Sequence, residues 1–141
     1  YLKGSIRCQW LRGHNYRNAR RFMRAISARL EKKEKLGLFD YYTLGKLIHY
    51  TTDAFTYAHN DTFPTALSDH REYEAALQDH FLEYMKQDPK VNPKIAGSVM
   101  EAIYSYHREY EAQAANIYTD TRFALNACCC VLAVLLTNPI F

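Results

Sequence analysis

The sequence contains few of the residues that interrupt regular secondary structure, with five glycines and four prolines in 141 residues. A β-sandwich needs frequent turns, which such residues favour, so this scarcity argues against that class of fold. Twelve tyrosines instead suit helices with wide amphipathic faces. No stretch rich in Gly, Ser or Pro divides the chain, and we therefore expect a single helical domain over residues 1–141.

The chain has little excess charge of either sign. Eighteen Lys and Arg residues against fifteen Asp and Glu residues leave a net charge of +3, which gives no strong nucleic-acid signal. Basic residues stripe the first predicted helix, either as a solvated face or as a peripheral contact with an anionic membrane surface. They are Arg17, Arg20, Arg21, Arg24, Arg29, Lys32, Lys33 and Lys35. Too few aromatic residues accompany them for a platform that stacks single-stranded bases.

The spacing of the cysteines argues against a disulfide-stabilised protein, and the length of the apolar runs argues against a membrane-spanning one. Of the four cysteines, Cys128, Cys129 and Cys130 are adjacent, so on a helix they point in different directions and cannot form a disulfide framework. We expect them to be small buried apolar side chains, which favours a reducing compartment. The apolar stretch over residues 124–136 is thirteen residues long, short of the roughly 20 that span a bilayer. It predicts a buried core helix and no transmembrane segment.

Breakers and apolar periodicity predict an all-α fold, a compact bundle of about five helices with no strand. The expected helices cover residues 15–35, 41–59, 66–86, 93–116 and 120–136. Gly37 is expected to stop the first helix, Asp40 to be the N-cap of the second, and Pro93 to lie in the first turn of the fourth.

Two histidine–carboxylate pairs lie on consecutive predicted helices. His49 and Asp53 are four residues apart, as are His70 and Glu74, so each pair shares one helix face and offers a nitrogen and an oxygen to one point. Zinc accepts both donors at about 2.0–2.2 Å. One such pair is usually a surface contact. Two pairs, with His59 in the connection between them, predict a site for zinc or another first-row divalent ion rather than calcium.

The segment His49–His59 resembles the core motif of the bacterial zinc-dependent phospholipase C family. That motif reads His, three residues, Asp, five residues, His, and a second motif of His, three residues and Glu follows about a dozen residues later. His70 and Glu74 match the second motif in order and spacing. Gly13-His14 matches a Gly-His dipeptide that precedes a long helix in the family. The resemblance covers residues 13–75, about half of the chain.

The resemblance implies an all-helical bundle that holds zinc ions in a cleft and hydrolyses phospholipids or related phosphodiesters. One zinc ion would be bound by His14, His49 and Asp53, and another by His59, His70 and Glu74. In the family, Asp at the position of Asp53 bridges two metals. Related single-strand nucleases share this cluster but end in Asp, so Glu74 is the phospholipase-like choice.

The chain lacks the family's further ligands upstream of the Gly-His dipeptide. We therefore expect either a chain without its N-terminal portion or a divergent member with two zinc ions, since a third would need those upstream ligands. No general base is assigned. The alternatives are a single-strand nuclease-like hydrolase and a catalytically silent helical domain that zinc stabilises. Localisation stays open, because the family is often secreted whereas the cysteines favour a reducing compartment.

The remaining polar candidates lie near the predicted ligands. Asp61 and Asp69 are candidates to orient histidine ligands, with surface solvation as the alternative, and Tyr57 is a candidate for the rim of the cleft. His107 and Glu111 repeat the four-residue spacing, but no partner histidine lies nearby in the sequence. We expect that last pair to be structural.

Overall fold

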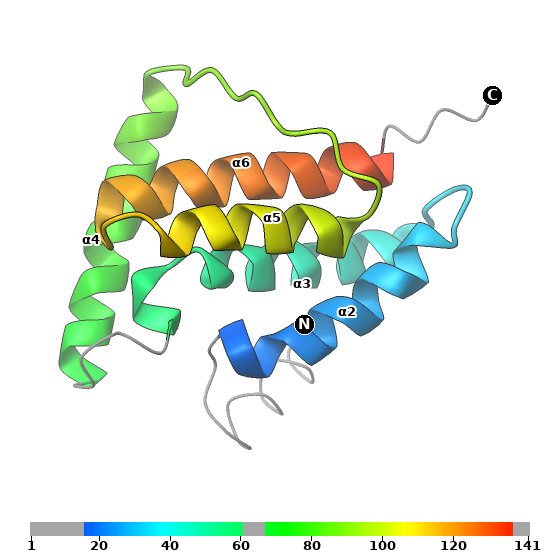
Figure 1. Cartoon of the computed structure of the whole chain (residues 1–141), viewed down its shortest axis with the longest axis horizontal. Coiled ribbons are helices and arrows are strands. Elements are labelled where there is room, and N and C mark those ends of the chain that lie inside the picture. Colours follow the sequence, from blue (N-terminus) through cyan, green and yellow to red (C-terminus); the bar gives the residue numbers. More distant parts are fainter. Residues whose placement is uncertain (1–15, 61–66, 137–141) are drawn as a thin grey trace.

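The computed structural model describes residues 16–60 and 67–136, and within them the fold is all-α, as predicted (Figure 1). The helices are α2 (Tyr16–Glu31), α3 (Leu38–Ala54), the 3₁₀ turn η1 (Tyr57–His59), α4 (Leu67–Lys86), α5 (Val99–Glu111) and α6 (Ile117–Leu136). Over these residues the structure contains no strand. Two of the predicted site residues, His14 and Asp61, lie outside the described residues.

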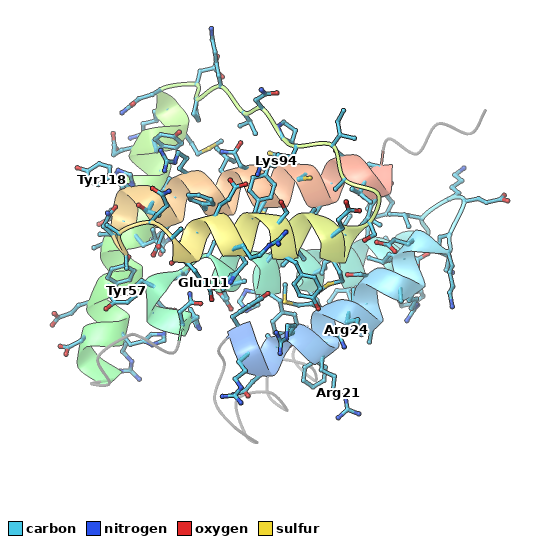
Figure 2. All side chains as sticks on the ribbon, viewed as in Figure 1. Arg21, Arg24, Tyr57, Lys94, Glu111 and Tyr118 are labelled. Atoms are coloured by element: carbon cyan, nitrogen blue, oxygen red, sulfur yellow. The ribbon has the colours of Figure 1, made fainter. Side chains whose placement is uncertain are left out.

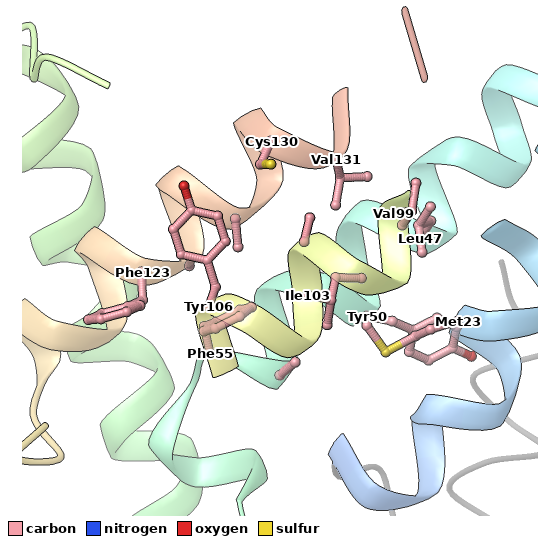
Figure 3. Packing of buried hydrophobic residues seen from close by; sticks show 14 of the residues in the cluster. Met23, Leu47, Tyr50, Phe55, Val99, Ile103, Tyr106, Phe123, Cys130 and Val131 are labelled. Carbon is pink, nitrogen blue, oxygen red and sulfur yellow. The ribbon is translucent and has the colours of Figure 1, made fainter. Parts of the chain in front are cut away.

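Four of the helices build the core, and the fifth lies outside it. In Figure 1, α3, α5 and α6 run side by side, α2 lies along α3, and α4 crosses the end of the bundle. The buried cluster includes Met23 of α2, Tyr50 of α3, Ile103 of α5 and Val131 of α6 (Figure 3). Burying each such side chain contributes roughly 1.5–3 kcal/mol relative to exposure. No described residue of α4 belongs to this cluster, because α4 packs mainly on α6 and η1.

The structure corrects the predicted first residues of two helices, α3 and α5, because the residue that caps each helix differs from the expected one. Gly37 is the N-cap of α3 rather than only a stop signal, and its N–H donates to Oδ2 of Asp40 at 2.9 Å. Asp40 is therefore the third residue of α3, not its N-cap. The fourth predicted helix does not begin at Pro93, because α5 begins at Val99, where Oγ of the N-cap Ser98 accepts from the N–H of Glu101 at 3.1 Å.

The second predicted helix was also too long. The helix α3 ends at Ala54, and the chain turns through Thr56 before the separate turn η1. His59 therefore lies on a different element from His49 and Asp53. This break sets the direction in which the imidazole of His59 points.

The C-terminal helix α6 begins three residues earlier than predicted and is 20 residues long. By length and composition alone this helix is long and apolar enough to cross a membrane. Half of its apolar window is buried in the bundle, and core helices pass the same test. Cys130 is buried there, while Cys128 and Cys129 are partly buried, and all three are free thiols. Burial raises the pKa of Cys128 to about 11.

Candidate metal centre

Three predicted ligands converge where η1 meets α4. Nε2 of His59 lies 2.7 Å from Oε1 of Glu74, and Nε2 of His70 lies 3.1 Å from the same oxygen. One donor atom from each of the three residues lies within 4.8 Å of the others. The rings of His59 and His70 meet edge to face at 4.8 Å. His70 and Glu74 share a face of α4 as their spacing predicts, while His59 reaches them from another element.

The turn after α3 places His59 in this cluster. Nδ2 of Asn60 donates to the carbonyl oxygens of Thr56 at 2.8 Å and of Ala54 at 3.3 Å, which closes the turn. The N–H of Tyr57 donates to Oδ2 of Asp120 on α6 at 2.8 Å. As a result His59 is buried, with 6% of its surface exposed.

The second predicted pair continues the cluster along α3. Nε2 of His49 lies 3.2 Å from Oδ2 of Asp53, and the other oxygen, Oδ1, lies 3.8 Å from Nε2 of His59. The carboxylate of Asp53 is therefore located between His49 and the cluster around Glu74. Five of the six predicted ligands form one continuous series of contacts, and the sixth, His14, lies outside the described residues.

Electrostatics keep the carboxylate of Glu74 available as a charged ligand. Burial alone would raise the pKa of Glu74, but the hydrogen bond from His59 and the charges of His59 and His70 outweigh it and lower that pKa. Two imidazole nitrogens and one carboxylate oxygen form a donor set that zinc accepts in catalytic sites, where a fourth position stays open for water or substrate. The donors of His59, His70 and Glu74 thus fit a zinc ion.

The other polar candidates occupy different surroundings. Asp69 is exposed in the first turn of α4. The ring of Tyr57 packs edge-on against Tyr73 at 5.8 Å, and Tyr57 lines a pocket of about 310 Å³ together with His59 and Glu111. Figure 2 labels Tyr57 and Glu111 among the side chains. Tyr57 and His59 therefore line the same cavity, and the role of Tyr57 at the rim of a substrate cleft stays a prediction.

His107 supports the turn after α3. Its Nε2 lies 3.1 Å from the carbonyl oxygen of Ala54 and 3.2 Å from Oδ1 of Asn60, and its ring stacks on Tyr16 at 3.8 Å. Nδ1 lies 3.3 Å from Oε1 of Glu111. Burial lowers the pKa of His107, and the charge of Glu111 only partly offsets this. This third histidine–carboxylate pair therefore supports the turn that carries His59.

Asp120 is an important residue of this region that the sequence analysis missed. Its side chain is fully buried and accepts three hydrogen bonds, from the N–H of Tyr57 at 2.8 Å and from the hydroxyls of Tyr73 and Tyr110 at 2.6 Å each. Burial raises the pKa of Asp120, and these three hydrogen bonds oppose the rise. An acidic residue in the first turn of a helix is common because it complements the helix dipole. Its sequence position therefore gave no signal of this network.

Comparison with known proteins identifies the family. A family model described as zinc dependent phospholipase C matches residues 5–117, a range that contains all six predicted ligands. The chain belongs to this family. Neither a curated protein nor a solved structure matches it. Membership in the zinc-dependent phospholipase C family supports zinc as the metal and a phospholipase C-like hydrolase function in general, in agreement with the motif and the donor set.

Proposed function

We propose that this protein hydrolyses the phosphodiester bond of a phospholipid at a zinc centre held by His59, His70 and Glu74. The observation that carries the proposal is the convergence of two imidazole nitrogens and one carboxylate oxygen within 4.8 Å, in a chain of the zinc-dependent phospholipase C family. A three-ligand site of this type leaves a position open for a reactant, whereas a structural zinc site is usually closed by four protein ligands.

A second zinc ion would be held by His14, His49 and Asp53. The supporting observation is the position of Asp53, whose two oxygens face His49 and His59 at 3.2 and 3.8 Å. A carboxylate with one oxygen toward each histidine is suited to bridge two cations. Together the two sites would use six ligands and hold two ions, and a third ion would need ligands from outside this set.

The chemistry follows from the charge of the substrate. When bound, zinc supplies Lewis acidity, which polarises a phosphoryl oxygen and lowers the pKa of a nearby water molecule. The protein's own residues hold and orient the site. Glu74 and Asp53 provide the negative charge that retains cations, and the buried turn that carries His59 restricts its motion. The half-exposed Glu74 leaves the site accessible to a substrate, because 43% of its side chain is in contact with solvent.

The test is a hydrolysis assay on the zinc-loaded full chain. Its substrates are dihexanoylphosphatidylcholine, its ethanolamine, serine and inositol analogues, and p-nitrophenylphosphocholine as a chain-free phosphodiester. We expect release of diacylglycerol from the lipids and of p-nitrophenol from p-nitrophenylphosphocholine, which a chelator abolishes and added zinc restores. The variant Glu74→Gln should lose about 100-fold or more of this activity, because even residues outside the ligand set cost 10–100-fold. Glu72→Gln, which changes an exposed carboxylate of α4 two residues away, should retain it.

Other outcomes of the assay would contradict the proposal. Zinc-dependent release of nucleotides from single-stranded DNA, without lipid hydrolysis, would identify a nuclease. Stoichiometric zinc binding with no hydrolysis of any of these substrates would identify a domain in which zinc only stabilises the fold.

A further inference from the structure

The first turns of α3 are inverted with respect to an ordinary surface helix, which places its apolar residues toward the core. Of the residues 38–42, only the charged one, Asp40, is buried, because its carboxylate accepts the N–H of Gly37 at 2.9 Å and so sets the start of the helix. The four apolar or aromatic side chains around it are all more than half exposed. These residues, here called the apolar patch, are Leu38 at 85%, Phe39 at 80%, Tyr41 at 54% and Tyr42 at 55%.

Basic side chains surround the apolar patch. Residues 29–46 contain five basic and three acidic side chains. Three of the basic residues are exposed in the turn between α2 and α3, namely Lys32, Lys33 and Lys35. Lys46 lies over the ring of Tyr42 at 5.2 Å. Two of the acids are engaged within the fold, because Asp40 is buried and Glu31 accepts a main-chain hydrogen bond from the start of α5 at 2.7 Å. The surface around the patch is therefore positive.

The exposed face of α3 continues from the apolar patch toward the candidate metal centre. Residues spaced three or four apart share one face of a helix, and on this face they are Leu38, Tyr42, Gly45 and His49. A side chain at Gly45 would meet no atom within 4 Å, so the face is open there. His49, a predicted zinc ligand, is about 16 Å from Leu38 along the helix. A flat surface laid along this face would therefore contact the patch and run toward His49.

We propose that the apolar patch and its lysines dock this protein on an anionic lipid membrane, with the exposed face of α3 against the lipid. Leucine and aromatic side chains enter the boundary between headgroups and hydrocarbon, where tyrosine is especially favoured. The lysine stems extend along apolar surface while their ammonium groups reach the lipid phosphates. Such docking does not depend on hydrolysis. It goes beyond the proposed function, because it assigns the face that meets a membrane.

Charge complementarity favours an anionic membrane over two other occupants. A second copy of this chain, docked by the same face, would bring the lysines of both copies together, and like charges oppose association. A nucleic acid would offer phosphates to the lysines, but its protein interfaces are mostly polar and would leave the apolar patch without a matching surface. A membrane with anionic headgroups satisfies both the lysines and the patch.

The test measures co-sedimentation of the zinc-loaded full chain with vesicles that it cannot hydrolyse. The vesicles are pure phosphatidylcholine or its two-to-one mixture with phosphatidylglycerol, both as analogues in which a methylene group replaces the glycerol oxygen on phosphorus. We expect the unchanged protein to bind the mixed vesicles about tenfold or more tightly than the pure ones. Each lysine near an anionic surface contributes about fivefold, so Lys32→Gln combined with Lys35→Gln should remove most of this preference.

Two exposed apolar positions at opposite ends of the bundle give a matched comparison. Leu38→Gln combined with Phe39→Gln changes the patch, which lies at the end remote from α4 (Figure 1). Tyr118→Gln changes a 73% exposed ring at the other end, where α6 begins beside α4 (Figure 2). Neither change removes a buried side chain, so both proteins should fold. We expect the affinity for mixed vesicles to fall about tenfold or more in the first and to stay within about twofold in the second.

An added charge tests whether the open face of α3 meets the lipid. Gly45→Glu places a carboxylate there without a clash and replaces a glycine that is unfavourable inside a helix, so this variant should fold. Its affinity for mixed vesicles should fall about fivefold. Gln87→Glu makes the same change of charge at an exposed position after α4 and should have no such effect.

Equal affinities of the Leu38→Gln/Phe39→Gln and Tyr118→Gln proteins, or no preference for mixed vesicles, would overturn the proposal. A dimer in analytical ultracentrifugation that Leu38→Gln/Phe39→Gln abolishes, without vesicle binding, would instead identify the patch as an interface between copies. Hydrolysis is measured separately on ordinary lipids. Its absence would overturn the proposed function and leave the result of the binding experiment unchanged.

Discussion

The main-chain N–H of Tyr57 donates a hydrogen bond of 2.8 Å to Oδ2 of Asp120, a residue 63 positions later in the chain. Because Tyr57 is the first residue of η1, this contact fixes the turn that carries His59. The same carboxylate accepts from Tyr73, which precedes Glu74 on α4. Asp120 therefore holds together the two elements whose ligands converge, although it is not itself in the predicted ligand set.

Replacement of Asp120 should disturb both stability and zinc binding. In Asp120→Ala the N–H of Tyr57 and two tyrosine hydroxyls lose their acceptor. We therefore expect the free energy of unfolding, measured by urea denaturation, to fall by about 3 kcal/mol. Zinc affinity should fall because η1 and α4 are no longer tied to one carboxylate. Asn126→Ala, at a partly buried position of the same helix, is the control and should change neither property strongly. An unchanged zinc affinity in Asp120→Ala would contradict the positioning role.

The number of bound zinc ions should depend on which histidine is removed. We expect about two zinc ions per unchanged chain. His49→Ala and His70→Ala should each retain about one ion, but a different one, because the two histidines belong to different predicted sites. His80→Ala is the matched control, since His80 lies on α4 but contacts Thr121 at 3.0 Å and the ring of Tyr118. Elemental analysis of dialysed protein gives the counts. A single ion that both His49→Ala and His70→Ala abolish would indicate one shared site instead.

Removal of zinc should lower the stability of the whole bundle. A ligand that binds only the folded state at a free concentration of 1,000 times its Kd stabilises that state by about 4 kcal/mol. The candidate site joins η1 and α4 and continues to α3, so chelation is expected to lower the Tm and to expose α4 to proteolysis first, because α4 contributes no described residue to the buried cluster. Limited proteolysis with and without chelator measures this order. Equal cleavage in both conditions would argue against a metal at this site.

Local spacing predicted the parts of the site that depend on a single helix. His49 meets Asp53 and His70 meets Glu74 because residues four apart share a helix face whatever the helix packs against. The start of α5 was missed because Pro93 and Ser98 both give acceptable local signals, and the choice depends on capping. The role of Asp120 depends on contacts across the bundle, which no local pattern contains.

The pH dependence of stability should report the burial of His107. An unfolded histidine has a pKa near 6.5, and burial lowers the pKa of His107 in the folded chain. As pH falls through about 6.5, the unfolded state takes up a proton that the folded state does not, so this residue's contribution to the free energy of unfolding decreases. The loss is at most about 1.4 kcal/mol per pH unit. Urea unfolding of the zinc-free protein at pH 7.5 and 5.5, compared with His107→Gln, measures it. The difference in unfolding free energy between the two proteins should shrink toward acid pH, and parallel curves would show that His107 is protonated as readily when folded as when unfolded.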